Sequence, residues 1–253
     1  MMTDTKKTPL YETHRSLGAK IVDFAGYQMP VVYGSIIGEH RAVRECVGLF
    51  DVSHMGEFIV AGKRARQFIN GLITNDCMGL RPGDLQYTVM CRENGTVVDD
   101  LLINVLAEDR LLLVVNASNI EKDLAHVTAF PRDGVEVTNV SDDIALIAVQ
   151  GPRTKDTLMA CEFFADVRDE LDRLSYYSGF SFEHRGGEVL VSRTGYTGEL
   201  GYEIFLPAGQ AVALWGDTTE TGASCGIAPV GLGARDTLRF EASYRLYGHE
   251  LDD

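Results

Sequence analysis

Apolar residues recur at a helical period in several stretches of the 253-residue chain. After Ser35, an N-cap residue, they recur at roughly helical spacing as far as Gly48, where we expect the helix to end. A second stripe, at i, i+3, i+4, i+7 and i+8, begins at Ala65. Ser118 with Glu121 three residues on is a capping box. Further helices are predicted after Gly151-Pro152, from Ala211 and from Gly231.

Runs of β-branched and apolar residues between turn residues predict strands. The run 49–60 is strand-like but is interrupted by Asp51, Ser53 and His54, and a structural role is expected for His54. Turn residues separate the runs 86–90, 97–105 and 111–116, a pattern that predicts an antiparallel meander. Together with the helices this predicts an α+β fold with largely antiparallel sheets. Other expected strands are 21–25, 135–140, 144–150 and 188–193.

Two adjacent carboxylates, Asp99 and Asp100, lie inside the apolar run 97–105. Side chains alternate along a strand, so Asp100 shares one face with Val98 and Asn104, while Asp99 lies on the other. A buried carboxylate without a partner costs several kcal/mol, so these groups are paired, protonated or at a cleft. The alternative is a structural aspartate at a bulge or a sheet edge, and the pattern alone favours neither interpretation.

Composition narrows the function classes. The formal charge of −14 argues against a non-specific nucleic-acid binder, which needs clustered Lys and Arg. The five cysteines are widely spaced, without metal-ligand spacing, and are expected to be reduced thiols. No secretory signal and no 18-residue apolar run is present, so neither a membrane nor export is expected, and the predicted location is the cytoplasm.

Two glycine-rich stretches could approach a ligand. The stretch 194–204 combines three glycines with two tyrosines, and the alternative is a plain glycine-rich hairpin. The Gly231-x-Gly233 pair lacks the third glycine and the preceding strand of a dinucleotide fingerprint, so neither NAD nor a flavin is expected.

Several motifs, in order along residues 8–253, together resemble one known family, the T-protein (aminomethyltransferase) of the glycine cleavage system. The resemblance implies a tetrahydrofolate-dependent enzyme without a metal. It would transfer a methylene group from the aminomethyl-lipoyl arm of the H-protein to tetrahydrofolate, and release ammonia. The motifs are DVSHMGE (51–57), VDDL (98–101), VVNASNIEKD (114–123), SRTGYTGE (192–199), GLGARD (231–236) and LYG (246–248).

The same resemblance assigns roles to individual residues. Asp100 is similar to the essential acidic residue near the reactive folate nitrogens. Glu203 is similar to the carboxylate that pairs with the pterin amino and ring N–H groups, and Arg235 to a cofactor- or substrate-contacting arginine. The remaining residues implied in the folate pocket are Met55, Tyr87, Asn116, Tyr176, Tyr177 and Tyr196.

The resemblance also implies two interwoven lobes around a central folate pocket, with residues 1–50 and 140–253 in one lobe and 51–139 in the other. Two departures stand out. Asn104 replaces a tyrosine of some family members, and the sequence ends at Asp253, where family members continue into a C-terminal β-barrel domain. The competing hypotheses are a folate-binding module without catalysis and a related folate-dependent demethylase.

Overall fold

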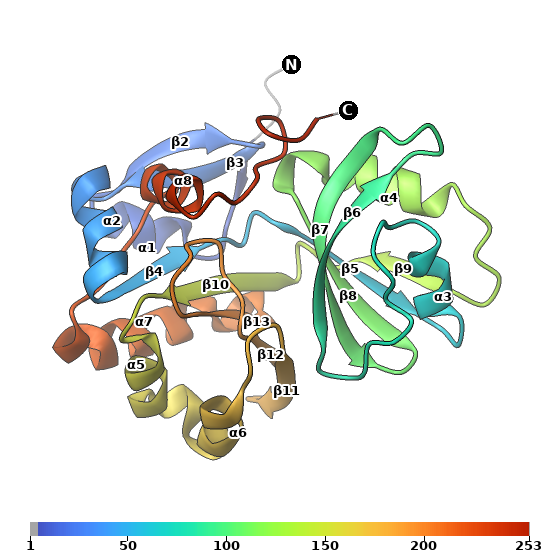
Figure 1. Cartoon of the computed structure of the whole chain (residues 1–253). Coiled ribbons are helices and arrows are strands. Elements are labelled where there is room, and N and C mark those ends of the chain that lie inside the picture. Colours follow the sequence, from blue (N-terminus) through green and yellow to red (C-terminus); the bar gives the residue numbers. More distant parts are fainter. Residues whose placement is uncertain (1–4, 253) are drawn as a thin grey trace. The chain divides into compact units, whose positions relative to one another are not determined.

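The computed structural model describes residues 5–252, which form two compact units (Figure 1). Unit 1 contains residues up to His54, Asp143–Tyr176 and Ser181–Tyr244; unit 2 contains Met55–Asp142, Tyr177–Phe180 and the residues from Arg245 on. Each unit is therefore assembled from segments far apart in the sequence.

Unit 1 contains a three-stranded and a six-stranded sheet, with strand orders β1-β3-β2 and β11-β12-β13-β10-β4-β14. In the larger sheet β10 pairs antiparallel with β13 and β4, and β14 pairs parallel with β4. Helices α5 and α7 pack against β13 and β10, whereas α2 packs on β4 and α8 on β3 (Figure 1). The strands are β1 (Lys6–Lys7), β2 (Lys20–Phe24), β3 (Tyr27–Val32), β4 (Val47–Asp51), β10 (Ile144–Gln150), β11 (Gly179–His184), β12 (Gly187–Ser192), β13 (Gly201–Pro207) and β14 (Ile227–Pro229); the helices are α1 (Tyr11–Ser16), α2 (Ile36–Glu45), α5 (Thr154–Ala160), α6 (Arg168–Arg173), α7 (Ala211–Gly222) and α8 (Leu232–Glu241).

Unit 2 is built on a five-stranded antiparallel sheet of order β6-β7-β8-β5-β9. Residues of both helices, among them Ile69 and Val127, join one hydrophobic cluster with Leu101, Ile103 and Leu113 of the sheet, so α3 and α4 cover the same sheet face. The elements are β5 (Gly56–Ala61), α3 (Ala65–Asn70), β6 (Leu85–Cys91), β7 (Val97–Ala107), β8 (Arg110–Val115), α4 (Ile120–Thr128) and β9 (Glu136–Asn139). Short 3-10 helices elsewhere are Ala117–Asn119, Glu162–Val167, Ala208–Gln210 and Ala223–Cys225.

The predicted α+β class with largely antiparallel sheets is confirmed, and so is the meander of β6, β7 and β8. Ser35 caps α2 as predicted, because its hydroxyl accepts a hydrogen bond from the Gly38 N–H at 3.1 Å. Gly48 does not end this helix. It lies inside β4, where a Cβ would come within 2.4 Å of Val43, so the position requires glycine for packing.

The predicted capping box at Ser118 is wrong. Ser118 lies within the 3-10 turn 117–119, and Asn119 occupies the N-cap position of α4 without a side-chain hydrogen bond to the helix. The Asn119 amide instead donates to the Asp99 carboxylate at 2.7 Å. A tertiary hydrogen bond to a buried charge has therefore displaced the local capping interaction.

The run with the acidic pair contains a β-bulge. The pairing of β6 with β7 passes from Met90–Asp99 directly to Cys91–Val97, so Val98 is the extra residue. Val98 is fully buried in the same hydrophobic cluster as Leu101. The prediction that Val98 shares the face of Asp100 is therefore wrong, because strict alternation does not pass through a bulge.

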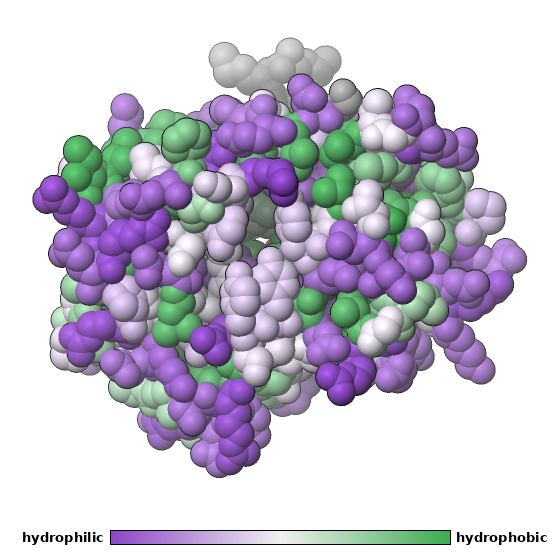
Figure 2. Space-filling view, viewed as in Figure 1, coloured by the Kyte–Doolittle hydropathy of each residue, from purple (hydrophilic) through white to green (hydrophobic). Residues whose placement is uncertain are grey.

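The visible surface is mostly hydrophilic, with apolar areas small and separated (Figure 2). No helix between residues 5 and 252 is both long and apolar enough to span a membrane. All five cysteines are free thiols. The hydrophilic surface agrees with the acidic composition, and the free thiols agree with the expected reduced state of the cysteines.

Candidate functional site

In unit 2, Asp100 lies on β7 with its carboxylate held by two donors. Tyr87 Oη donates to Oδ2 at 2.9 Å, and Asn116 Nδ2 donates to Oδ1 at 2.9 Å. Burial, aided by the neighbouring Asp99 charge, raises the pKa of Asp100, although the two hydrogen bonds act in the opposite direction. The Asp100 carboxyl is thus half-buried and available to a ligand, and its pKa is higher than that of an ordinary aspartate.

Asp99 lies behind Asp100 and is fully buried. Three N–H groups donate to it: the Asn116 backbone at 3.0 Å, Asn116 Nδ2 at 2.8 Å and Asn119 Nδ2 at 2.7 Å. Asn116 therefore joins both members of the acidic pair. The structure brings together the predicted residues Tyr87, Asp100 and Asn116, and gives Asp99 the supporting position.

Asp123 extends this cluster and was missed in the sequence. It lies on α4 and is fully buried, and its carboxyl interacts electrostatically with that of Asp99. No N–H or O–H donor of residues 5–252 reaches its two oxygens. Burial and the Asp99 interaction raise the pKa of Asp123 to about 10. The spacing of Asn119 and Asp123, one helical turn apart, was the signal that could have revealed it.

Asn104 and Glu57 share the sheet face of Asp100. The strand alternates regularly from Asp100 to Asn104, and Glu57 reaches the same face through its register with Val114. Both side chains are buried, and neither the Asn104 amide nor the Glu57 carboxyl has a hydrogen-bond partner in the described chain. Burial raises the pKa of Glu57 well above its ordinary value. Such orphaned polar groups are rare in native structures.

In unit 1, Glu203 on β13 accepts a hydrogen bond from Thr194 Oγ1 at 2.5 Å. Burial raises the pKa of Glu203, against the effects of Thr194 and the nearby Arg235. Arg235 on α8 lies over the Tyr196 ring, with its Cζ 4.7 Å from the ring centroid, and Tyr196 stacks on Tyr244. Burial lowers the pKa of Arg235.

Both polar groups keep unused hydrogen-bonding capacity. Within residues 5–252, only the Oε2 oxygen of Glu203 accepts a hydrogen bond, and the Arg235 guanidinium has no hydrogen bond or ion pair. Each side chain is half-buried rather than sealed. A carboxylate and a guanidinium in this state suit a planar polar ligand with N–H donors and acceptors.

The glycines of the 194–201 loop, which connects β12 and β13, make room for one side chain. A Cβ on Gly195 would lie 1.9 Å from Gln150 Oε1, and a Cβ on Gly201 would lie 2.2 Å from the Gln150 amide. Gln150 is fully buried and accepts a hydrogen bond from Thr197 Oγ1 at 2.9 Å, while its amide donates to the Thr194 carbonyl at 3.2 Å. The close approach predicted at these two glycines is therefore explained by Gln150.

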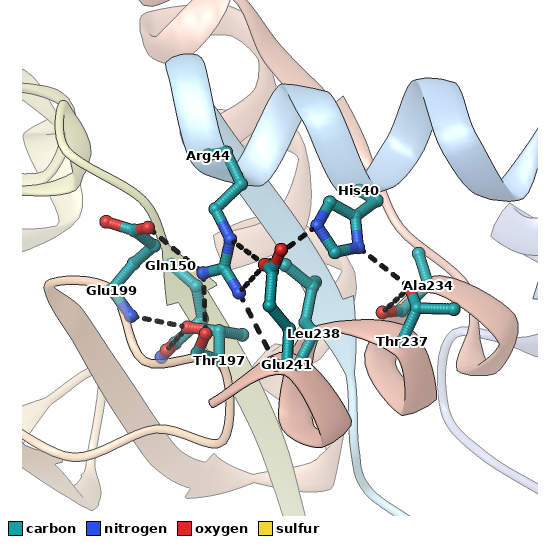
Figure 3. A network of polar contacts seen from close by, with 9 residues as sticks. All are labelled: His40, Arg44, Gln150, Thr197, Glu199, Ala234, Thr237, Leu238 and Glu241. Carbon is teal, nitrogen blue, oxygen red and sulfur yellow. Dashed lines mark hydrogen bonds and ion pairs between the residues drawn. The ribbon is translucent and has the colours of Figure 1, made fainter. Parts of the chain in front are cut away.

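A polar network ties this loop to two helices (Figure 3). Arg44 of α2 donates to the Thr197 carbonyl at 2.6 Å, to Glu199 Oε1 at 3.0 Å and to Glu241 Oε2 of α8 at 2.8 Å. His40, one turn earlier on α2, lies 3.2 Å from the same Glu241 oxygen. The loop that carries Tyr196 is thus held at Thr197 both through its backbone carbonyl, by Arg44, and through its side-chain hydroxyl, by Gln150.

The remaining predicted residues occupy varied positions. Tyr176 is exposed, and Met55 and Tyr177 are half-buried. Tyr177 has a positive φ of 58°, a strained conformation for a non-glycine residue, and its carbonyl accepts the Leu85 N–H at 3.1 Å. His54 is buried and lies edge-on against Phe24, and its Nδ1 has no hydrogen-bond partner in the described chain, so it is not fully satisfied. Burial, with the Arg235 charge, lowers the pKa of His54 to about 3.

Asp51, which interrupts the strand-like run 49–60, lies in a second buried polar cluster, in unit 1. Asp51 accepts hydrogen bonds from Thr8 Oγ1 at 2.6 Å, from His14 Nε2 at 2.8 Å and from the Ser53 N–H at 2.9 Å. Tyr33 Oη lies 2.8 Å from His14 Nδ1. Despite burial, His14 and the hydroxyl donors hold the pKa of Asp51 below its ordinary value.

Comparison with known proteins assigns the family. The profile of the family described as GCVT N-terminal domain matches residues 10–253. The chain is 49% identical to an aminomethyltransferase of Halothermothrix orenii, over 98% of this chain and 68% of that protein, and 50% identical to one of Chloroherpeton thalassium, over 98% and 67%. The crystal structure of the glycine cleavage system aminomethyltransferase T from Bartonella henselae superimposes with a TM-score of 0.86 at 36% identity, covering 98% of this chain and 65% of that one.

These matches place the chain among the transferase enzymes. It belongs to the GCVT N-terminal domain family, whose matched members are named aminomethyltransferases. The resemblance drawn from the sequence motifs is thereby confirmed. The chain spans about two thirds of the length of the relatives it matches.

Proposed function

We propose that the protein performs the T-protein reaction of glycine cleavage, with tetrahydrofolate as co-substrate and the lipoylated H-protein as partner, in the cytoplasm. In this reaction the two folate nitrogens replace the amino group and the lipoyl sulfur on the transferred methylene, and their two N–H protons leave with the ammonia and the lipoyl thiol. The products are 5,10-methylenetetrahydrofolate, ammonia and the reduced lipoyl thiol. The family match and the names of the relatives support the reaction class, and the residue roles below are our assignment.

The observation that carries the proposal is the state of Asp100. It is a half-buried carboxyl, hydrogen-bonded by Tyr87 and Asn116, with its pKa raised by burial. The raised pKa brings this carboxyl closer than an ordinary aspartate to the protonation equilibrium that general acid–base catalysis uses. We assign Asp100 to orient the folate nitrogens and to accept and return a proton as nitrogen attacks the methylene and ammonia leaves.

The unit 1 residues fit the recognition of a pterin ring. Glu203 Oε1 is free to accept an N–H, and the Arg235 guanidinium, which lies over the Tyr196 ring, keeps its N–H donors for a ligand. A carboxylate pairs well with adjacent amino and ring N–H donors. Met55, Tyr176 and Tyr177 are assigned as further pocket residues on the resemblance alone.

Asp100→Asn tests the central role. The amide retains the shape but carries no exchangeable carboxyl proton, so formation of methylenetetrahydrofolate from the aminomethylated H-protein should fall by roughly 10²–10⁴-fold. The control is Asp109→Asn, in the exposed turn after the same strand, which should match the wild type. Turnover retained by Asp100→Asn, with an unchanged unfolding midpoint, would sink the assignment.

Binding distinguishes the alternatives. Calorimetric titration with tetrahydrofolate should show binding by the wild type and weakened binding by Glu203→Gln, since the amide presents an N–H donor of its own toward the N–H groups of the ligand. Folate binding without turnover by the wild type would favour a non-catalytic module. Methylene transfer from N-methylated amines, and not from the H-protein, would favour a demethylase.

A further inference from the structure

The Arg44 guanidinium on α2 joins the loop between β12 and β13 to helix α8 (Figure 3). Its Nη1 donates to the Thr197 carbonyl at 2.6 Å and to Glu199 Oε1 at 3.0 Å. Its Nε donates to Glu241 Oε2 at 2.8 Å, and its Nη2 lies 2.6 Å from the same oxygen and 3.4 Å from the Leu238 carbonyl. An arginine has five N–H donors, and these contacts engage each of them, so Arg44 keeps none for a ligand.

The same loop touches the end of α8 through its backbone. Gly198 has a positive φ of 81°, and a Cβ at this position would lie 2.9 Å from the Cβ of Ala242, the residue that follows α8. Only glycine combines this conformation with so close an approach. The loop therefore presents no side chain to α8 at Gly198, and the directional bonds beside this contact come from the Arg44 fork.

The two segments that Arg44 joins carry residues assigned above to pterin recognition. Tyr196 precedes Thr197 in the loop, and Arg235 lies on α8 with its Cζ 4.7 Å from the centre of the Tyr196 ring. Tyr244, which follows α8, stacks on the same ring, with 5.8 Å between the ring centroids. The place of the Tyr196 ring relative to Arg235 thus depends on how the loop lies on α8.

We propose that Arg44 is a positioning residue, which holds the loop on α8 so that Tyr196 and Arg235 are in place before the ligand binds. Without its bonds, ligand binding would have to order the loop, and such ordering lowers affinity. Asp100, to which we assign the chemistry, belongs to unit 2 and is held by its own donors, so the loss should fall on binding and not on turnover. The effect on folate binding rests on the proposed function, whereas the ordering of the loop does not.

Steady-state kinetics separate the two effects. In Arg44→Gln, the KM for tetrahydrofolate should rise about tenfold while kcat stays within about twofold of the wild type. Arg44→Lys keeps the charge but replaces the planar fork by a compact ammonium, so its KM should lie closer to that of Arg44→Gln than to that of the wild type. The matched control is Arg41→Gln, an exposed position on the same helix, which should behave as the wild type. A fall in kcat with unchanged KM, or a wild-type KM in Arg44→Lys, would overturn the proposal.

Amide hydrogen exchange of the peptide 194–201 gives a readout that is independent of turnover. In ligand-free protein this peptide should exchange about tenfold faster in Arg44→Gln than in the wild type or Arg41→Gln, and saturating tetrahydrofolate should restore its protection. The peptide 144–150, in the same sheet as β13, should be unchanged. Unchanged exchange of the loop, or faster exchange of both peptides, would overturn the proposal. Faster exchange of the loop alone, with a wild type that does not bind tetrahydrofolate, would support the ordering by Arg44 and refute the proposed function.

Discussion

Two fully buried aspartates, Asp51 in unit 1 and Asp123 in unit 2, have pKa values shifted in opposite directions. Asp51 accepts hydrogen bonds from Thr8, His14 and Ser53, and its pKa lies below the ordinary value. No N–H or O–H donor of residues 5–252 reaches the Asp123 carboxyl, and its pKa lies near 10. Burial is common to both, so the supply of donors decides which aspartate is charged.

The contrast distinguishes a cluster with a fixed charge and a structural role from one whose protonation can change. Around Asp51 every donor supports one charged group, which makes the cluster a fixed part of the unit 1 core. Asp123 has no such donor, and the Asp99 charge that acts on it belongs to a pair that Asn116 joins to the half-buried Asp100. Only the second arrangement links the interior to a carboxyl that a ligand can reach.

The largest effect is expected at the fixed cluster. Asp51→Asn removes the acceptor charge and leaves the donors of Thr8 and His14 poorly satisfied, so the free energy of unfolding should fall by about 3–5 kcal/mol. Urea unfolding measures it. The control is Asp143→Asn, exposed before β10, with an expected change within about 0.5 kcal/mol. A loss below about 1 kcal/mol for Asp51→Asn would mean that the donors do not depend on the charge.

A smaller, pH-dependent effect is expected at Asp123. Its pKa is near 10 in the folded protein and ~3.9 in the unfolded chain, so the folded state holds one more proton between these values. The resulting stability is fully present below about pH 4 and is lost as the pH rises toward about 10, at up to ~1.4 kcal/mol per pH unit. Urea unfolding of wild type and Asp123→Asn between about pH 6 and about pH 9 should therefore show a wild type whose relative stability falls with pH. Parallel curves would contradict the neutral acid.

The smallest effect concerns the helix starts, where the same competition for donors operates. Ser35→Ala should destabilise the protein by about 1 kcal/mol, since Ser35 accepts the Gly38 N–H. Ser118→Ala should change stability by less than about 0.5 kcal/mol, because Ser118 caps nothing. Thermal unfolding of both variants measures the difference, and equal losses would restore the capping box that the structure rejects.

Sequence periodicity predicted the meander, several other strands and most helices, because each depends on local burial patterns, but it did not predict β3, β11, β13 and β14. It failed at Val98, where the bulge changes the face of a side chain, and at Asn119, whose side-chain amide donates to the Asp99 carboxylate instead of capping the helix. The motifs singled out Asp100, and the structure adds Asn116 and Tyr87 as its donors. Asp123 was not predicted: its spacing from Asn119 was a signal in the sequence, but the neighbouring Asp99 lies on another element, and only the packing of α4 on β7 brings the two carboxyls together.

The buried Gln150 has an evolutionary consequence. Its amide occupies the space that side chains at Gly195 and Gly201 would need, so the three positions form one shared volume contributed by two chain segments. They should therefore vary together among relatives, with an alanine at either glycine position accompanied by a residue smaller than glutamine at position 150. In a library that randomises the loop alone, both glycines should return unchanged, whereas joint randomisation with position 150 should admit new pairs.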